Sequence, residues 1–352
     1  MTAPLDSLIQ CGTKLWLDSV DPNLTSKNYQ WGVTGATSNP IIIAELIRSG
    51  RFDSLISGMA HEGYSADHVT WHLTDYLVAE AEKIFLPVFG KTKKNDGYVS
   101  FELDPLLEDV HSNLTHAEKV SRYVQLAKKW SDGHPNRMIK VPATPAGIDS
   151  LSSIAAMGIP LNVTLIFSDA QYEKARNAVW QGAQTLKSWD GFKSVYSIFV
   201  SRIDVYVESK YQGLSPQAQG FAGILNAKMI WQKNQEFWKD KKLPLEQEIV
   251  FASTGTKKPS DQPWKYVVAL AGADIQTNPP STNDAVAGSD VDFVRTIDQF
   301  PAASVVGEIQ RTINWSQLEA DLMSDGLKKF SDPQHALIGL VEKKILAFSS
   351  KN

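Results

Sequence analysis

The chain has 352 residues, of which 43% are hydrophobic and 10% aromatic, so it can bury a sizeable core. Its formal net charge of −4 at pH 7 gives no electrostatic reason to bind nucleic acid or an acidic membrane. Cys11 is the single cysteine, so the sequence offers neither a disulfide framework nor a thiolate cluster for a metal. No apolar run is long enough to cross a bilayer and the first residues lack the features of a secretion signal, so we expect a cytoplasmic protein without a membrane partner.

Short apolar runs alternate with helical stretches along most of the chain. Strands are expected at 15–18, 31–40, 98–104, 138–144, 161–168, 194–202, 249–256 and, more weakly, 274–280. Helices are expected at 41–47, 65–86, 115–130, 145–157, 169–187, 216–239, 263–271, 290–330 and 334–348. This alternation, without a Gly-x-Gly-x-x-Gly sequence after the first strand, favours a closed (β/α)8 TIM barrel over an open dinucleotide-binding sheet. We expect one domain over residues 1–352, with an inserted helix before the third strand and a helical C-terminal tail.

The fourth predicted strand, Met138–Thr144, carries one lysine, Lys140, within an apolar run. Burial disfavours the charged form of an amine and lowers its pKa. A lysine that is neutral near pH 7 attacks ketones and aldehydes and forms a Schiff base. On this segment alone, the more ordinary alternative is a strand-end lysine that reaches solvent or pairs with a carboxylate.

The other predicted strands strengthen the case for chemistry. Strands of a parallel barrel are covered on both faces and are normally apolar throughout. Here, side-chain alternation places polar groups on one face of several strands, which we expect to line the barrel interior. In chain order these groups include Asp18, Glu102 with Asp104, Lys140, Asn162 with Thr164, and Ser253. Polar groups on the same face of five strands indicate a shared site rather than five separately satisfied buried groups.

The residue types suggest how such a site would work. Lys140 would attack a carbonyl, and Glu102, with its pKa raised inside the barrel, would donate and later accept the protons of dehydration and hydrolysis. Asp18 could take a proton from a substrate hydroxyl and so start cleavage of the adjacent carbon–carbon bond.

Further residues could bind the substrate. Thr164 could hold the water, and Asn39 and Asn162 could bind substrate hydroxyls. Arg202, expected at the end of the sixth strand, suits a phosphate, although it could equally pair with Asp204 or another surface acid.

The motifs resemble those of the transaldolases, class I Schiff-base enzymes built on an (α/β)8 barrel, over about residues 15–330. They are Trp16-Leu17-Asp18, Thr37-Ser38-Asn39-Pro40, Val99-Ser100-Phe101-Glu102-Leu103-Asp104, Ile139-Lys140-Val141-Pro142-Ala143-Thr144, Asn162-Val163-Thr164-Leu165-Ile166-Phe167-Ser168 and Ser197-Ile198-Phe199-Val200-Ser201-Arg202. The family moves a dihydroxyacetone unit from a ketose phosphate (sedoheptulose 7-phosphate or fructose 6-phosphate) to an aldose phosphate, without metal or organic cofactor. This resemblance implies a pentose phosphate pathway enzyme.

The resemblance also implies residue roles. Lys140 would be the Schiff-base lysine, Asp18 the acid and base at the C4 hydroxyl, and Glu102 with Thr164 would handle the water. The dihydroxyacetone part would lie against Asn39, Asn162 and Ser197, and the phosphate against Arg202.

One position departs from the family pattern. Many transaldolases carry a second phosphate-binding arginine shortly after the seventh strand, where this chain has Ser253-Thr254-Gly255. We expect Lys257, the nearest cation, to take over part of the phosphate contact together with Ser253.

Two other functions stay open at this stage. A fructose 6-phosphate aldolase would release free dihydroxyacetone, but such enzymes tend to carry glutamine where this chain has Glu102. A catalytically silent barrel acting as a binding protein should have lost a lysine or acid position, and none is lost. His68 and His72 share a helical face but lack a third ligand, so we expect no metal site. The sequence does not fix the oligomeric state; a homodimer is one candidate.

Overall fold

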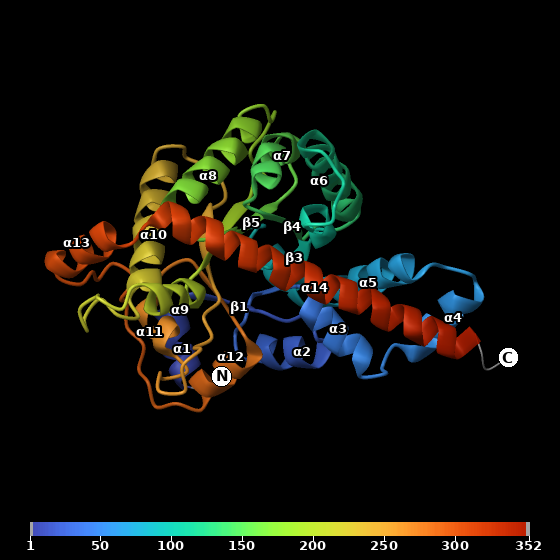
Figure 1. The fold of residues 1–352 in the computed structure, drawn as a ribbon, viewed down its shortest axis with the longest axis horizontal. Helices are drawn as coiled ribbons and strands as arrows, with labels where there is room; N and C mark the ends of the chain where they lie inside the picture. The colour runs from blue at the N-terminus through green and yellow to red at the C-terminus, as the bar shows by residue number, and fades with distance from the viewer. Residues whose placement is uncertain (1–2, 350–352) are drawn as a thin grey trace.

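The computed structural model describes residues 3–349, and within this range parallel strands close into a barrel in chain order (Figure 1). The strands are β1 (Lys14–Leu17), β2 (Gly35–Thr37), β3 (Val99–Glu102), β4 (Arg137–Pro142), β5 (Leu161–Ile166), β6 (Ser194–Phe199), β7 (Glu248–Ala252) and β8 (Ile275–Asn278). Parallel pairing of β1 with β8 closes the ring. The predicted (β/α)8 barrel is therefore confirmed.

Helices surround the barrel and extend beyond it (Figure 1). They are α1 (Ala3–Gln10), α2 (Pro22–Gln30), α3 (Pro40–Arg48), α4 (Asp53–His61), α5 (Ala66–Lys91), α6 (His116–Ser131), α7 (Pro145–Ala156), α8 (Asp169–Ala183), α9 (Ser201–Lys210), α10 (Ala222–Lys239), α11 (Lys265–Ala269), α12 (Pro280–Ala287), α13 (Ala303–Thr312) and α14 (Trp315–Ser349), with a 3-10 helix η1 (Pro105–Glu108). Sequence reasoning missed α1, α2, α4, α9 and α12. None of the helices within residues 3–349 is long and apolar enough to cross a membrane.

Three predicted boundaries are wrong because packing outweighs local signals. Pro87 does not end α5, since the helix continues to Lys91 and Phe89 packs edge-on against Tyr98 at 5.3 Å between ring centroids. The expected helix at 290–330 begins with an irregular segment, and α13 and α14 follow it. Pro333 lies inside α14 rather than between two helices.

The buried side chains of α14 explain why it runs through this proline. Phe330, Gln334, Leu337 and Val341 recur at intervals of three or four residues and continue one buried stripe past Pro333. Burial of this stripe offsets the cost of about 3 kcal/mol that a proline brings to a helix interior.

The barrel interior is divided into an apolar floor and a polar upper layer. The floor consists of Trp16, Tyr98, Met138, Val195, Val250 and Ile275. On β4, Ile139 and Val141 pack in the outer core, while Lys140 between them points inward, as side-chain alternation predicts. The polar residues therefore gather above the floor, at the carboxyl ends of the strands, where TIM-barrel active sites lie.

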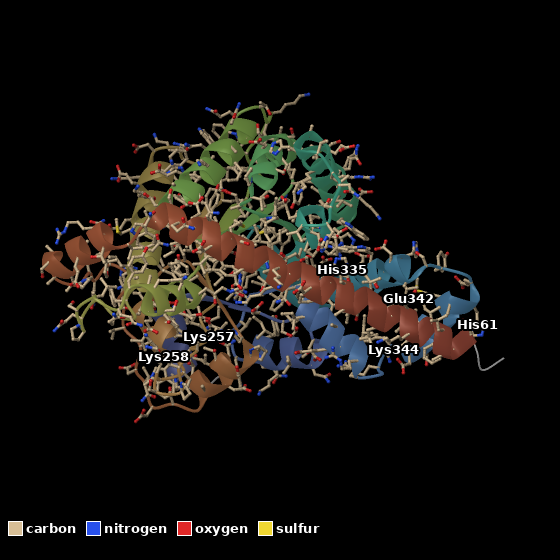
Figure 2. The ribbon with its side chains drawn as sticks, in the orientation of Figure 1. His61, Lys257, Lys258, His335, Glu342 and Lys344 are labelled. Carbon is tan, nitrogen blue, oxygen red and sulfur yellow. The ribbon has the colours of Figure 1, made fainter. Side chains whose placement is uncertain are left out.

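α14 crosses the whole molecule, from the side of α9 and α10 to the tip formed by α4 (Figure 1). It packs against α3, α4 and α5. Two contacts hold it in place: an ion pair, with Lys344 Nζ 2.5 Å from Asp53 on α4, and a hydrogen bond between His335 Nε2 and Asp109 beside η1, at 3.1 Å. Figure 2 shows His335 and Lys344 along this helix.

Asp204 joins α9 to α10 and is predicted to make stability depend on pH. It is 2% exposed, and its Oδ1 accepts a hydrogen bond from Gly223 N at 2.7 Å. Burial raises the pKa of Asp204 from 3.8 to about 6. The folded pKa lies above the unfolded one, so this contribution is fully present below about pH 4 and is lost as pH rises through 6.

Asp204→Asn keeps the acceptor but cannot ionise. We expect its melting temperature to exceed the wild-type value by roughly a few °C above pH 7, with the difference shrinking toward pH 4. Thermal unfolding monitored by circular dichroism between pH 4 and 8 measures this. An offset that is the same at both ends of the range would contradict it.

Candidate active site

The predicted site residues converge at the carboxyl ends of the strands, around a cavity of about 190 Å³. Eight of them line it directly: Asp18, Asn39, Lys140, Thr164, Ser197, Arg202, Ser253 and Lys257. Glu102 and Asn162 lie beneath this lining and contact Lys140 and Ser197 respectively. Sequence reasoning missed other lining residues, among them Thr37, Phe199, Thr277, Lys329 and Phe330.

The centre of the site is a contact between Lys140 and Glu102. Parallel pairing of β3 with β4 sets these two residues opposite each other. Lys140 Nζ donates to Glu102 Oε2 at 3.0 Å, and to Ser38 O at 3.4 Å. Lys140 is 5% exposed and Glu102 7%, so the lysine does not reach bulk solvent. Lys140 does pair with a carboxylate, as the more ordinary alternative required, but the pair lies inside the barrel beside an open cavity.

Glu102 can change its protonation state near neutral pH. Burial raises the pKa of Glu102 from 4.5 to about 7, although the Lys140 ammonium and, more weakly, the Arg202 guanidinium lower it. The nearby Asp18 carboxylate adds to the increase. An acid with this pKa, in contact with an amine, can both receive and return a proton at physiological pH.

Asp18 is held at the edge of the cavity by the hydroxyl group of Thr37. Thr37 Oγ1 donates to Asp18 Oδ1 at 2.9 Å and lies 3.2 Å from Thr277 Oγ1. Thr37 comes from β2 and Thr277 from β8, the two neighbours of β1 in the barrel. The carboxylate is therefore held by Thr37, whose hydroxyl is in turn positioned by Thr277, and it remains in contact with the cavity.

Asn162 and Asn39, the two predicted amides, differ in which side-chain atoms remain free to bind a ligand. Asn162 donates to Ser100 Oγ at 2.9 Å and accepts from Ser197 Oγ at 2.7 Å, so it orients Ser197, which lines the cavity. Asn39 uses its side-chain oxygen to cap α3 through Ile41 N and Ile42 N. Its amide nitrogen is then the group it can present to a ligand.

Thr164 lies at a local irregularity that the sequence did not reveal. The register between β5 and β6 shifts between Val163 and Ile166, and Leu165 has a φ of 57°. Such bulges redirect side chains near active sites. Within residues 3–349 the buried hydroxyl of Thr164 has no hydrogen-bond partner, which is unusual for a buried group and leaves it able to hold a water or substrate atom.

The bulge also corrects the predicted face of β5. Strict side-chain alternation along β5 would place Leu165 and Phe167 on the outer face together with Leu161 and Val163. Instead Ile166 takes the place in the outer core, and Leu165 and Phe167 join a second apolar cluster beside the site. The extra residue reverses the side-chain alternation from that point onward.

The structure corrects two further expectations, one for Arg202 after the end of β6 and one for Asp104 after the end of β3. Arg202 does not end a strand, because β6 stops at Phe199 and Arg202 lies in the first turn of α9. It does not pair with Asp204, which accepts from the backbone of α10. Asp104, expected inside the barrel, caps η1 through Leu106 N, because the chain turns outward after Glu102.

Three cations gather at one end of the cavity: Arg202 on α9, Lys257 in the loop after β7, and Lys329 on α14. Burial and the positive charges of Arg202 and Lys329 lower the pKa of Lys257. The guanidinium of Arg202 lies over the ring of Phe199 at 5.0 Å, and its buried Nη1 has no partner within residues 3–349. Uncompensated donors of this kind suit a doubly charged anion such as a phosphate group.

The Lys257 loop is anchored by its neighbour. Lys258 Nζ lies 2.6 Å from Glu208 Oε1 on α9, and Figure 2 shows Lys257 and Lys258 near α9 and α11. Ser253, also expected here, lies 2.9 Å from Ser201 between their hydroxyl oxygens. Lys329 pairs with Asp325 at 2.6 Å and extends the cluster from a helix that was predicted only as a tail.

No three His, Cys, Asp or Glu side chains within the described range are placed to hold a metal ion.

Comparison with known proteins identifies the family. A family model described as transaldolase/fructose-6-phosphate aldolase matches residues 15–341. The chain belongs to this family. The transaldolase of Kocuria rhizophila is 32% identical over 97% of this chain and 98% of its own length. Transaldolase 2 of Streptomyces coelicolor is 31% identical over 98% of both chains, and the transaldolase of Thermobifida fusca is 29% identical over 99% of this chain and all of its own.

These relatives confirm the resemblance that the motifs predicted. They also support an enzyme of the transaldolase type, a transferase, over an aldolase or a silent barrel. Family membership implies sugar phosphate substrates.

The protonation of Glu102 provides a test of the site that does not depend on turnover. In protein labelled with ¹³C at the glutamate carboxyl carbons, we expect one signal, missing in Glu102→Gln, to titrate near pH 7 rather than 4.5. Lys140→Met removes the neighbouring positive charge and should raise this pKa further. A Glu102 signal that titrates near 4.5 in both proteins would show that the carboxyl group is well solvated.

Proposed function

We propose that this protein transfers a dihydroxyacetone unit from a ketose phosphate, such as sedoheptulose 7-phosphate or fructose 6-phosphate, to an aldose phosphate through a Schiff base at Lys140. The main support is the buried contact of Lys140 with Glu102 beside the cavity, 3.0 Å between Nζ and Oε2. A proton shared within this pair gives a neutral amine next to a neutral acid, the two forms that the first steps require.

Formation of the Schiff base uses both members of the pair. Lys140 Nζ attacks the ketose carbonyl, and proton transfer from nitrogen to oxygen gives a carbinolamine. Glu102 in its acid form then protonates the departing hydroxyl, which leaves as water and produces the iminium. Thr164, with its unpaired hydroxyl at the cavity wall, holds this water for the later hydrolysis.

Carbon–carbon cleavage falls to Asp18. Its carboxylate removes the proton of the C4 hydroxyl, the C3–C4 bond breaks, and the electron pair moves into the iminium to form an enamine. The aldose phosphate leaves as an aldehyde, and the dihydroxyacetone unit stays on Lys140. An acceptor aldehyde then adds to the enamine, Asp18 returns the proton, and water assisted by Glu102 releases the new ketose phosphate.

Asn39, Asn162 and Ser197 would hold the dihydroxyacetone part, with Asn162 acting partly through Ser197. The phosphate would bind among Arg202, Lys257 and Lys329, together with Ser253. Lys257 and Lys329 thus supply the positive charge that the missing arginine would have provided.

We also propose that this enzyme works in the pentose phosphate pathway and in the cytoplasm. Sugar phosphates are doubly charged and do not cross a lipid bilayer unaided, so their enzyme works in the compartment where they are made. A homodimer stays a prediction, which light scattering on purified protein would test.

Borohydride reduction tests the covalent step. With fructose 6-phosphate present, we expect reduction to label Lys140 and to inactivate the enzyme, because borohydride converts a Schiff base into a stable amine. Peptide mapping by mass spectrometry locates the label. Lys228, a second buried lysine whose pKa burial lowers to about 8, is the matched control and should stay unlabelled. Labelling that persists in Lys140→Ala would reject the assignment.

The same preparation separates transfer from release of free dihydroxyacetone. Without an acceptor, a transferase should release about one equivalent of glyceraldehyde 3-phosphate per site and then stop; erythrose 4-phosphate should restore continuous turnover. Continuous release of dihydroxyacetone without an acceptor would favour the aldolase.

The phosphate site is tested by charge removal. We expect Lys257→Ala and Lys329→Ala each to raise KM for fructose 6-phosphate roughly tenfold, because a charge-assisted hydrogen bond is lost, and to leave KM for unphosphorylated fructose nearly unchanged. Lys328→Ala removes the same charge from the exposed neighbour of Lys329, outside the cavity lining, and should change neither value more than about twofold. Equal effects on both donors would reject a phosphate role.

A further inference from the structure

A buried amide on α14 points to a further part of the active site. Gln334 is 3% exposed, and its Nε2 has no hydrogen-bond partner within residues 3–349. A buried donor without a partner costs roughly 1–3 kcal/mol, so it calls for a partner that protein groups alone do not supply.

Gln334 lines a small cavity together with Glu102. The cavity has a volume of about 10 Å³ and is separate from the one that Lys140 lines. A polar cavity of roughly 10–15 Å³ holds one water molecule. Its remaining polar walls come from Ser38, Asn39 and Thr74, and its apolar walls from Pro40, Ile43, Trp71 and Pro105.

The hydrogen-bonding capacities around this cavity match one water. Glu102 uses Oε2 to accept from Lys140, which leaves Oε1 able to accept a further hydrogen bond. Thr74 donates its hydroxyl proton to Thr70 O at 2.9 Å and keeps lone pairs free to accept. A water can therefore accept from the Gln334 amide and donate to Glu102 Oε1 and to Thr74 Oγ1.

The position of Gln334 follows from the geometry of α14. It lies four residues after Phe330, so both side chains project from the same face of the helix. The Phe330 ring lies 5.4 Å from Lys140 Nζ. One helix face thus contacts the lysine with an aromatic ring and reaches the glutamate cavity with an amide.

We infer that Gln334 is a positioning residue for Glu102: its amide holds one water in this cavity, and that water donates a hydrogen bond to the carboxyl oxygen not used by Lys140. The inference rests on the proposed function, because it assigns Gln334 to the proton traffic of that reaction. This water is a neutral hydrogen-bond donor. It stabilises the ionised carboxylate of Glu102 and does not itself take up the proton that Glu102 exchanges.

The charged groups facing Glu102 come from three other elements: Lys140 on β4, Asp18 at the end of β1 and Arg202 on α9. These charges, together with burial, determine most of the pKa of Glu102. From α14 the group facing Glu102 is the uncharged Gln334, so the water it holds adjusts this pKa without a change of net charge.

Gln334→Met is the test, because methionine keeps the length of the side chain but cannot donate. In the carboxyl ¹³C titration we expect the pKa of Glu102 to rise by roughly one unit, since the carboxylate loses a donor. We expect kcat for fructose 6-phosphate and erythrose 4-phosphate to fall roughly tenfold. KM should change less than about twofold, because Gln334 does not line the larger cavity.

Ser331→Ala is the matched control. Ser331 is a buried polar residue on the same helix, 6% exposed, and lines neither cavity around Glu102. Its removal should leave the titration and kcat unchanged. A crystal structure should show a water within hydrogen-bond distance of Gln334 Nε2 and Glu102 Oε1.

The outcomes separate this inference from the proposed function. An active wild type with a Gln334→Met variant of unchanged Glu102 titration would overturn the inference alone. So would a crystal structure in which Gln334 donates elsewhere, or a variant that is less stable but titrates like wild type. An inactive wild type whose Lys140 is not labelled would overturn the proposed function. The titration of Glu102 in Gln334→Met would then decide alone whether Gln334 holds the water.

Discussion

The contact between Lys140 and Glu102 is the interaction on which the site depends. Burying two opposite charges costs several kcal/mol for each ion, and their attraction recovers this only in part. Transfer of one proton from the amine to the acid turns the pair into two neutral groups. The proposed Schiff-base chemistry needs these two neutral groups, an amine that can attack and an acid that carries a proton.

The barrel supplies this environment through register and layering. Because β3 and β4 pair with Glu102 opposite Lys140, the two side chains leave adjacent strands at the same height. The apolar floor that begins with Trp16 keeps water from the interior below them. The cavity above opens toward three cations, so a substrate held by its phosphate at that end would extend its carbon chain toward the amine.

The parts of the candidate site that lie on strands could be predicted from the sequence, because polar residues differ visibly from the apolar residues around them. A lysine or glutamate stands out in a strand that should be apolar on both faces, so Lys140, Glu102 and Asn162 could be recognised. Polar residues on helices and in loops carry no such contrast, since most of them face solvent. Lys329 and Gln334 were missed for that reason.

Other features escaped because they depend on tertiary geometry. The bulge at Leu165 has no composition signal, since a leucine with positive φ is held there by its surroundings. Arg202 lines the cavity but was expected on the wrong element, because no helix-capping residue marks the start of α9. Pro333 gave a false stop signal, because the buried stripe of α14 outweighs it.

The position of α14 in the chain has a consequence for how the enzyme is made. The barrel strands end at Asn278, whereas Lys329, Phe330 and Gln334 belong to the last helix. A ribosome therefore exposes β4, with Lys140, well before it delivers the helix that walls the cavity. The cavity around Lys140 is therefore enclosed only after α14 has been synthesised, however early the strands themselves emerge.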